Sequence, residues 1–354
     1  MSVTKVGAAM QDLTDDYAFT GTVSGAGAPS HRNDIINGGL VVNQENQTAP
    51  ADAAYTIGDL FLHNGEGTPV MSLETDGPQG TRPWQKMVLD ANAQGGLAYI
   101  VPNDTVQDYI ANGKMSFGIQ LKTTSATIAN ARIGVIKWTG TADAVTKELV
   151  GTWASDGTNP TLATSLSYEN TPANLGLTTS WARHTVEDVT VDADTTNIIL
   201  FVWTNDGTIT ASDVIGFSEW QLNPGSTVNA FSSPGADVVQ TQVERFIERL
   251  FATGVNNHNL GVAISATTTL TQWMPHWNTQ KRSAPAVTSA ATAGFRVWDG
   301  SANQVATGIS LSMGTVDVCS INLTVSGFTV GRCSRIAKEV AVDCWVQADA
   351  RIGV

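Results

Sequence analysis

Cysteines and basic residues are scarce in this sequence, and each scarcity argues against a class of protein. The 354 residues include three cysteines, Cys319, Cys333 and Cys344. An odd number without closely paired spacing argues against a disulfide scaffold and against a zinc site. Lys and Arg number 19 against 32 Asp and Glu, which gives a net charge of −13. Because nucleic-acid binding depends on cations that neutralise phosphates, we expect no nucleic-acid partner.

Long hydrophobic runs are missing too. The longest, Ile198–Trp203, suits a buried strand and is far shorter than the roughly 20 residues that cross a bilayer. The first ten residues lack the apolar core of a secretory signal, so we expect synthesis in the cytoplasm and no membrane insertion. The sequence also lacks paired histidine spacing and a phosphate-binding glycine loop. We therefore expect no enzymatic activity and no cofactor.

A series of short apolar segments separated by turn residues makes up most of the chain. Met115–Leu121 alternates apolar with small or polar residues, as a strand with one buried face does. Asn197–Trp203 is continuously apolar and suits a central strand, and Ile321–Val325 and Val340–Ala348 alternate again near the end. Many short strands at this spacing predict a mainly β protein, with a jelly-roll β-sandwich followed by a second, smaller β-sandwich.

One segment departs from the β pattern and predicts an amphipathic helix over Val238–Phe251. Its apolar residues lie on one helical face: Val239, Val243, Phe246, Ile247 and Leu250. This face must be buried, either against the chain's own domains or against other copies around a symmetry axis. Glu244 with Glu248 and Arg245 with Arg249 would be like-charged pairs within one helix. Because bridges between copies would satisfy these charges better, we expect the helix to form an oligomer interface.

These features divide the chain into four parts. Residues 1–31 are mostly small and polar and are predicted to be an extended attachment segment, although a flexible tail fits them equally well. Residues 32–232 form the predicted jelly roll, residues 233–256 the connecting helix, and residues 257–354 the C-terminal β-sandwich.

Tryptophans near loops are the candidates for sugar binding, because an indole face can stack on the C–H face of a pyranose. Trp138, Trp203 and Trp220 lie inside strand patterns and are expected in the core. The candidates nearer to loops or strand ends are Trp84, Trp153, Trp273 and Trp277. Core packing is the alternative for each of them.

The carboxylates give no clear catalytic pair or metal site. Glycoside hydrolysis needs two carboxylates across a groove. The candidate pairs lie near strand ends or turns, where local hydrogen bonding favours Asp: Glu187 with Asp188, Asp192 with Asp194, and Asp213 with Glu219. Asp192 and Asp194 also have a spacing that Ca²⁺ could use, but the glycine and distal glutamate of an EF-hand are missing. We expect a turn without metal.

Five segments in order resemble segments of bacteriophage tail-fibre and spike proteins. Arg32–Gln44 resembles the opening strand of that family, with its Arg-Asn-x-x-x-Asn-Gly pattern. Ser180–Val186 with Val191–Asn197 resembles the penultimate hairpin of the family, and Trp220–Phe231 resembles its closing strand. Val243–Leu250 resembles a helix start, and Gln280–Pro285 resembles the strand that opens the C-terminal domain. The chain departs from the family pattern at Asn223, Val243 and Glu244, where Glu, Cys and Gln are usual.

The resemblance implies a receptor-binding virion protein. It implies a jelly roll like that of carbohydrate-binding modules, then a helix and a small C-terminal β-domain, assembled as a homotrimer that binds a host-surface glycan. Residues 1–31 would attach to another virion protein. A head fibre or spike that decorates the capsid is the alternative within a virion. An accessory carbohydrate-binding module of a bacterial polysaccharide-active enzyme is the alternative of another class.

Overall fold

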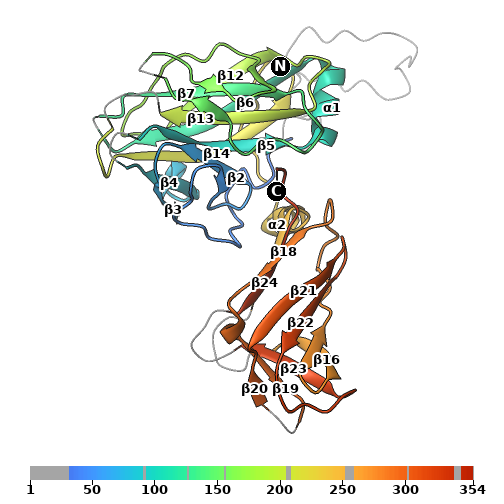
Figure 1. Ribbon diagram of the computed structural model, residues 1–354. Helices are drawn as coiled ribbons and strands as arrows, with labels where there is room; N and C mark the ends of the chain where they lie inside the picture. Colours follow the sequence, from blue (N-terminus) through green and yellow to red (C-terminus); the bar gives the residue numbers. More distant parts are fainter. Residues whose placement is uncertain are drawn as a thin grey trace, which may run out of the picture.

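The chain folds into two β-rich bodies, with α2 and the C-terminal end at their junction (Figure 1). The computed structural model describes residues 32–90, 93–125, 127–154, 157–204, 209–251, 259–300, 303–338 and 344–353. The attachment segment predicted for residues 1–31 lies outside the described residues. Among the described residues, no helix is long and apolar enough to cross a membrane.

The larger body is a sandwich of two antiparallel sheets, which confirms the predicted mainly β, jelly-roll fold. The strands of the seven-stranded sheet follow the order β1-β2-β5-β13-β7-β10, and β11 also pairs with β7. They span Ala54–Tyr55, Phe61–Gly65, Gly95–Val101, Asn197–Thr204, Asn130–Trp138, Leu166–Tyr168 and Leu175–Gly176, in the order β1, β2, β5, β13, β7, β10, β11. A separate pair, β8 and β9, spans Val150–Thr152 and Thr161–Leu162.

The second sheet of the sandwich has five strands in the order β12-β6-β14-β4-β3. They span Ala182–Thr190, Lys114–Thr123, Val214–Pro224, Trp84–Val88 and Val70–Glu74. A short 3-10 turn, η3, covers Pro78–Gly80 between β3 and β4. The predicted hairpin of 180–186 with 191–197 is wrong, because β12 lies in this sheet whereas β13 lies in the other.

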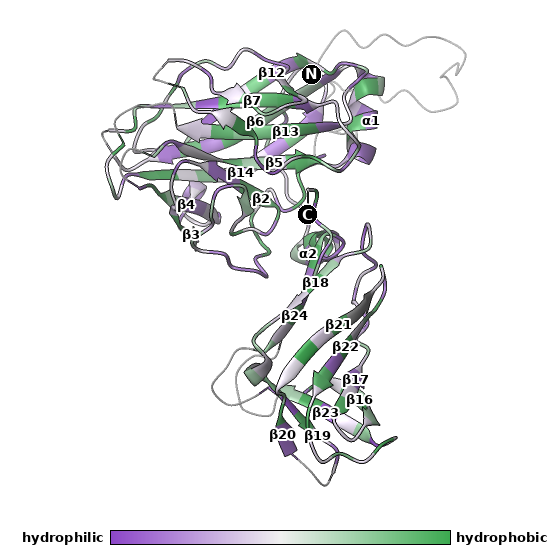
Figure 2. Ribbon diagram, in the orientation of Figure 1, coloured by the Kyte–Doolittle hydropathy of each residue, from purple (hydrophilic) through white to green (hydrophobic). Residues whose placement is uncertain are grey.

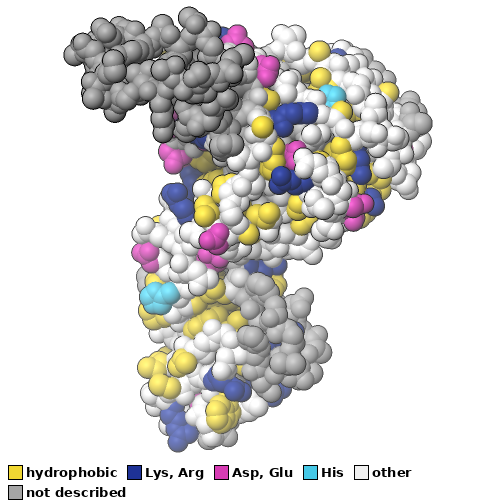
Figure 3. Space-filling view, turned by 180° about the vertical axis from the view of Figure 1, so that it is seen from behind, with side chains coloured by type: hydrophobic (Ala, Val, Ile, Leu, Met, Phe, Trp, Pro, Cys, Tyr) yellow, Lys and Arg dark blue, Asp and Glu magenta, His cyan; other side chains and the backbone are white. Residues whose placement is uncertain are grey.

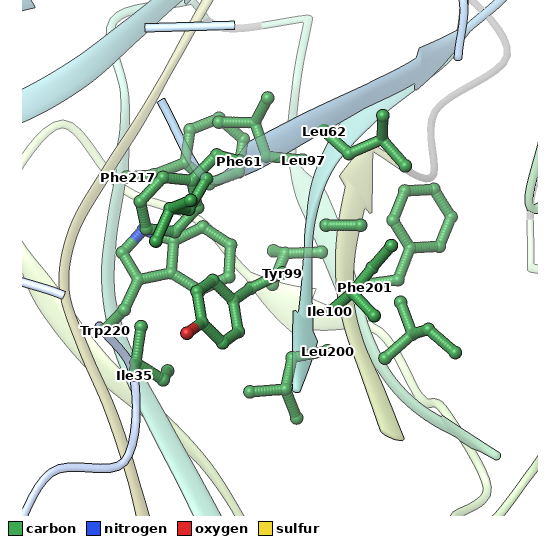
Figure 4. Close-up of a cluster of buried hydrophobic side chains, with 14 of the residues drawn as sticks. Ile35, Phe61, Leu62, Leu97, Tyr99, Ile100, Leu200, Phe201, Phe217 and Trp220 are labelled. Atoms are coloured by element: carbon green, nitrogen blue, oxygen red, sulfur yellow. The ribbon is translucent and has the colours of Figure 1, made fainter. Parts of the chain in front are cut away.

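The core fills the space between the two sheets. All eight residues of β13 are buried, as its continuous apolar sequence predicted (Figure 2). From the other sheet, Trp220 is fully buried, and its ring centroid lies 5.0 Å from that of Phe61 and 5.8 Å from that of Phe117. Figure 4 shows Trp220 beside Phe217 and Phe61. The sandwich is thus held by aromatic packing between sheets.

The predicted opening strand at 32–44 is wrong, because this segment forms turns and irregular backbone. Asn33 in this segment has a structural role. The Asn33 side chain donates to the carbonyl of Trp220 at 2.9 Å and accepts from the Leu222 amide at 3.1 Å. The segment therefore covers β14 through side-chain hydrogen bonds, which a local strand pattern cannot reveal.

A second helix, α1 (Asn103–Asn112), was not predicted. It buries Val106 and Tyr109 and ends at Gly113, whose φ of 74° is in the left-handed region that favours glycine. Asp34 accepts a hydrogen bond from the Tyr109 hydroxyl, which ties the helix to the irregular segment.

The smaller body has two antiparallel sheets. A three-stranded sheet has the order β15-β24-β18, spanning Ile247–Phe251, Trp345–Asp349 and Ala286–Ser289. A seven-stranded sheet has the order β20-β19-β23-β16-β17-β22-β21. Its strands span Asn303–Val305, Phe295–Trp298, Cys333–Lys338, Asn259–Thr267, Leu270–Trp273, Cys319–Thr324 and Gly308–Gly314, and the 3-10 turn η4 covers Thr292–Gly294. Cys344 is buried in this core, and all three cysteines are free.

The connecting helix is shorter than predicted. Helix α2 spans Ala236–Glu244, and the chain then turns and enters β15 at Ile247. The prediction failed because the apolar spacing here also suits a strand that contacts two cores. Ile247 belongs to the core of the larger body, whereas Leu250 packs against the core of the smaller one.

The residues predicted to form an oligomer interface are covered within one chain. Four of the five residues are buried within a single chain and the fifth packs against the C-terminal core: Val239, Val243, Phe246 and Ile247, then Leu250. The charges are satisfied within the chain as well. Glu244 accepts from Gln240 at 2.6 Å, and Arg249 donates to Gln347 at 2.8 Å. The apolar stripe therefore joins the two bodies of one chain.

A buried ion pair stabilises the junction. The side chains of Glu248 and Lys281 are 1% and 0% exposed, and they form an ion pair. Glu248 also accepts from the Asn278 amide at 2.8 Å, and Lys281 donates to the carbonyls of Glu244 and Thr279. Burial lowers the pKa of Lys281, while Glu248 opposes that shift.

A second network joins the C-terminal residues to the larger body. The buried Arg351 guanidinium donates to Glu45 at 2.6 Å and to Asp349 at 2.9 Å, and it lies 4.2 Å from the ring centroid of Tyr55. The Tyr55 hydroxyl donates to the Ile352 carbonyl at 2.7 Å. Two separate chain segments, β15 and the residues after β24, thus hold the bodies together.

We predict that Lys281→Met lowers the free energy of unfolding by about 3–5 kcal/mol, because it leaves the Glu248 charge buried without its partner. Urea unfolding followed by tryptophan fluorescence measures the change. Lys86→Met is the control, since Lys86 is 36% exposed and 4.0 Å from Glu74, and it should cost less than about 1 kcal/mol. Equal losses in the two variants would contradict a stabilising role for the buried pair.

Candidate functional site

A bulge in β14 creates the most distinctive polar position of the sandwich. Ser218 pairs with Gln120 of β6, and Gln221 pairs with Gly118, so Glu219 and Trp220 together lie opposite one residue. Glu219 has a φ of 51°, which is unfavourable for a residue with a Cβ. The extra residue lets Trp220 enter the core and directs Glu219 to the outer face of the five-stranded sheet.

Glu219 lies in a pocket of about 510 Å³ on that outer face, here called the groove. The groove is lined by residues of η3, β6, β12, β14 and the segment after β14: Gln79, Arg82, Gln120, Arg183, Thr185, Glu219, Val228, Asn229, Ala230 and Phe231. Arg183 and Gln120 are direct neighbours across β12 and β6. The lining thus combines two guanidinium groups, amides, one carboxylate and an aromatic ring.

Two acceptor oxygens in the groove lack a hydrogen-bond donor within the described residues. They are Oε1 of Glu219 and Oε1 of Gln120, and both atoms are buried. The Arg82 Nε lies 3.5 Å from Glu219 Oε1, close enough for an ion pair but not for a well-formed hydrogen bond. Glu219 is only 4% exposed. Its carboxylate is therefore largely desolvated and incompletely paired.

The two arginines are held by other parts of the site. Arg82 lies over the Phe231 ring, 5.4 Å from its centroid. Arg183 donates to the Asn229 carbonyl at 2.7 Å. Burial lowers the pKa of Arg183, and the nearby charges of Glu219 and Glu187 oppose this effect. Both guanidinium groups are thus oriented before any ligand binds.

An aromatic cluster adjoins the groove on the same face. The rings of Trp84 and Trp181 meet edge to face with centroids 5.4 Å apart, and Lys122 Nζ lies 4.1 Å and 4.7 Å from them. Lys122 is two residues beyond Gln120 on β6, and Trp181 is two residues before Arg183. Because alternate residues share a face, the cluster continues the groove along the strands.

The predicted sugar-binding tryptophans lie in different environments. Trp84 lies on the outer face, but it is only 4% exposed, and its indole N–H donates to Asp76 at 2.8 Å. Trp153 packs against the core, with its ring centroid 6.2 Å from that of Phe201. Trp273 and Trp277 are 3% and 6% exposed in the C-terminal core. Because a buried ring has no free face, the prediction for these last two is wrong.

The weak calcium candidate is occupied by a lysine. Lys137 Nζ lies 2.6 Å from Asp192 and 3.2 Å from Asp194, with Glu169 at 3.6 Å. The hydrogen bond that Lys137 donates to the Asp192 carboxylate raises the pKa of Lys137. Within the part of the chain that the structure describes, no group of three or more His, Cys, Asp or Glu is arranged for a metal ion.

The groove contains a single carboxylate among its lining residues, Glu219. Asp213, its partner in one candidate pair, directly precedes β14 and accepts from Thr127. Six residue steps along an extended chain place the two roughly 20 Å apart, far beyond the 5–9.5 Å between the carboxyl groups of glycosidases. The lining of the groove therefore does not present the carboxylate pair of a glycosidase.

Most of the groove is not apparent from the sequence. Gln120 belongs to a predicted strand, and Trp181, Arg183 and Phe231 belong to segments that resemble fibre proteins, but nothing local marks any of them as a site residue. Glu219 was considered only as half of a carboxylate pair. The sequence does contain one sign of the bulge. In Phe217-Ser-Glu-Trp220, two polar residues separate the two aromatic residues, which breaks the alternation of apolar and polar residues along β14. Such a break is typical of a bulge.

No protein-family model and no curated protein match this chain. Solved structures give matches of low similarity. A family 61 carbohydrate-binding module in complex with β-1,4-galactotriose has 12% identity and a TM-score of 0.32, covering 55% of this chain and 99% of the module. The CBM22-1 xylan-binding domain from Paenibacillus barcinonensis has 11% identity and a TM-score of 0.29, covering 49% and 88%.

A phage protein is also among the similar structures. The enzymatically active domain of tailspike protein 4 from bacteriophage CBA120 has 10% identity and a TM-score of 0.30, covering 54% of this chain and 21% of that one. All three TM-scores lie below 0.5, so a function for this chain has to be sought in its own residues.

We predict that Gly216→Ala disrupts the aromatic cluster. A Cβ at Gly216 would lie 2.9 Å from Trp84 and 3.0 Å from Trp181, so the indoles would have to move at a cost of about 1–3 kcal/mol. Tryptophan fluorescence and urea unfolding measure both effects. Gly176→Ala is the control, because a Cβ there meets nothing within 4 Å. An unchanged emission spectrum in Gly216→Ala would refute the packing described.

Proposed function

We propose that this chain is a non-enzymatic glycan-binding protein whose ligand lies in the groove of the five-stranded sheet. The observation that carries the proposal is Glu219, a buried and incompletely paired carboxylate held at a positive φ in the floor of the groove. An unmet hydrogen bond at a buried acceptor costs free energy, which a donor group of a ligand can recover. The strained backbone at the same residue is typical of functional sites.

The groups in the groove match the chemistry of a sugar. Hydroxyls both donate and accept, so they can donate to the free oxygens of Glu219 and Gln120 and accept from Arg82 and Arg183. The Phe231 ring and the adjacent Trp181 edge offer apolar surface to C–H groups. A buried acceptor without a donor costs about 1–3 kcal/mol, so donor hydroxyls at this position would contribute strongly to affinity.

Glu219→Gly tests the proposal. Glycine relieves the positive φ, so we expect a gain of about 1 kcal/mol in stability together with loss of glycan binding. Thermal unfolding measures the first, and a glycan array followed by calorimetry on any hit measures the second. Asp188→Gly is the matched control, since Asp188 has a φ of 58° and is exposed outside the groove. It should gain stability and keep binding.

If Glu219→Gly bound the same glycans as the unmodified chain, the groove would not be the site. If the unmodified chain bound no glycan on the array, the function itself would be wrong. The Asp188→Gly control shows whether a glycine at a position of positive φ changes glycan binding by itself.

We propose further that the protein is a fibre or spike on the virion of a tailed phage or phage-like particle. The support is the order of five sequence segments between residues 32 and 285 that resemble fibre proteins. The accessory module of a polysaccharide-active enzyme would use the same groove, so it fits the site equally well. Cryo-electron microscopy of particles labelled with an antibody to the C-terminal body tests the virion location and shows whether tail or capsid carries the protein.

The fibre proposal includes a homotrimer attached through residues 1–31. Light scattering of the 37.3 kDa chain should then give about three times that mass. A monomeric mass would count against the trimer. The apolar face of α2 is buried within one chain, whereas Val238 on the same helix is exposed. A substitution at Val238 therefore tests whether α2 contributes to assembly.

A further inference from the structure

The free end of the C-terminal body carries an exposed indole. Trp298 is 43% exposed at the end of β19, and Arg335 is its partner on β23. The Arg335 guanidinium carbon lies 5.4 Å from the centroid of the Trp298 ring. Trp273 and Trp277 of the same body are both below 10% exposed, so Trp298 is distinct from the core tryptophans.

A pocket of about 290 Å³ lies beside this pair, here called the tip pocket. Its lining comes from β16, β19 and β23 and from the turn after β19: Val262, Trp298, Asp299, Gly300, Cys333, Ser334 and Arg335. Val262 is 69% exposed and pairs with Arg335 on the other side of β23. The tip pocket therefore has one flat aromatic wall, one aliphatic wall and a guanidinium between them.

The charge at the tip pocket suits a negatively charged ligand. Its lining includes one cation, Arg335, beside the exposed Trp298 ring. Figure 3 shows hydrophobic and basic side chains side by side at this end. Arg335 Nε is buried and has no hydrogen-bond partner within the described residues. Asp299, the acidic residue of the pocket, is only 6% exposed and accepts from the Thr329 amide.

We propose that the tip pocket is a second saccharide site, specific for a sugar ring that carries a carboxylate. The pyranose would stack on Trp298, and its carboxylate would accept hydrogen bonds from Arg335. One guanidinium matches one carboxylate in charge and in its planar, two-donor geometry. The pocket is near the lower limit of about 300 Å³ for small-molecule sites, so it suits one ring. A nucleic acid would need several cations along its backbone.

The experiment uses the full chain and two forms of one probe, trigalacturonate and its methyl ester, in which a methyl group on each carboxyl removes the negative charge. The unmodified protein should bind the acid about tenfold or more tighter than the ester, because a hydrogen bond to a charged group is worth about that factor. Arg335→Gln should abolish this preference, and Trp298→Ala should weaken both forms about tenfold. Calorimetry measures each affinity.

A control variant checks that the effects are specific to the tip pocket. Asp188→Gly should bind trigalacturonate as the unmodified chain does, since Asp188 is exposed and lies outside both the groove and the tip pocket. Retained cooperative thermal unfolding checks that the two tip variants are folded. Equal binding of acid and ester, no binding of either, or a preserved preference in Arg335→Gln would overturn the proposal. A lower oligomer mass in Trp298→Ala with unchanged saccharide binding would also overturn it and indicate a contact between copies.

Discussion

The burial of Trp220 is the constraint on which the sandwich and its proposed site both depend. The Trp220 ring contacts Phe61 of the opposite sheet and Phe117 of the neighbouring strand β6, and it enters the core because β14 carries an extra residue. That extra residue is Glu219, which the bulge directs to the opposite face in a left-handed conformation. The packing of a large aromatic side chain and the placement of an unpaired carboxylate are therefore two results of one backbone irregularity.

Much of the fold could be predicted from local sequence, because burial follows the two-residue period of a strand. The alternation of Met115–Leu121 and the continuous apolar sequence of Asn197–Trp203 matched β6 and β13. The segment over 238–251 failed for a physical reason. Its apolar spacing fits one helical face and also fits a strand between two cores, and the buried partner of Glu248 is Lys281, 33 residues further along the chain.

The groove could not be predicted in the same way, because its residues come from separate strands and from the loops beside them. Arg183 and Gln120 are neighbours only through the pairing of β12 with β6. Burial also reversed the ranking of the tryptophans: Trp273 and Trp277 fill the C-terminal core, whereas Trp181 and Trp298 keep accessible surface. Which aromatic ring remains exposed depends on how the sheets pack, and this information is distributed over the whole chain.

The junction between the bodies has a consequence for avidity. A single flexible linker would let two binding sites reach many different spacings, and their joint effective concentration would depend on linker length. Here β15 and the residues after β24 connect the bodies at two places, through the Glu248–Lys281 pair and the Arg351 network. The groove and the tip pocket are then held at one spacing. Under the two binding proposals, a polymer whose sugars match that spacing would occupy both at little entropic cost, whereas a polymer that does not match it would occupy only one.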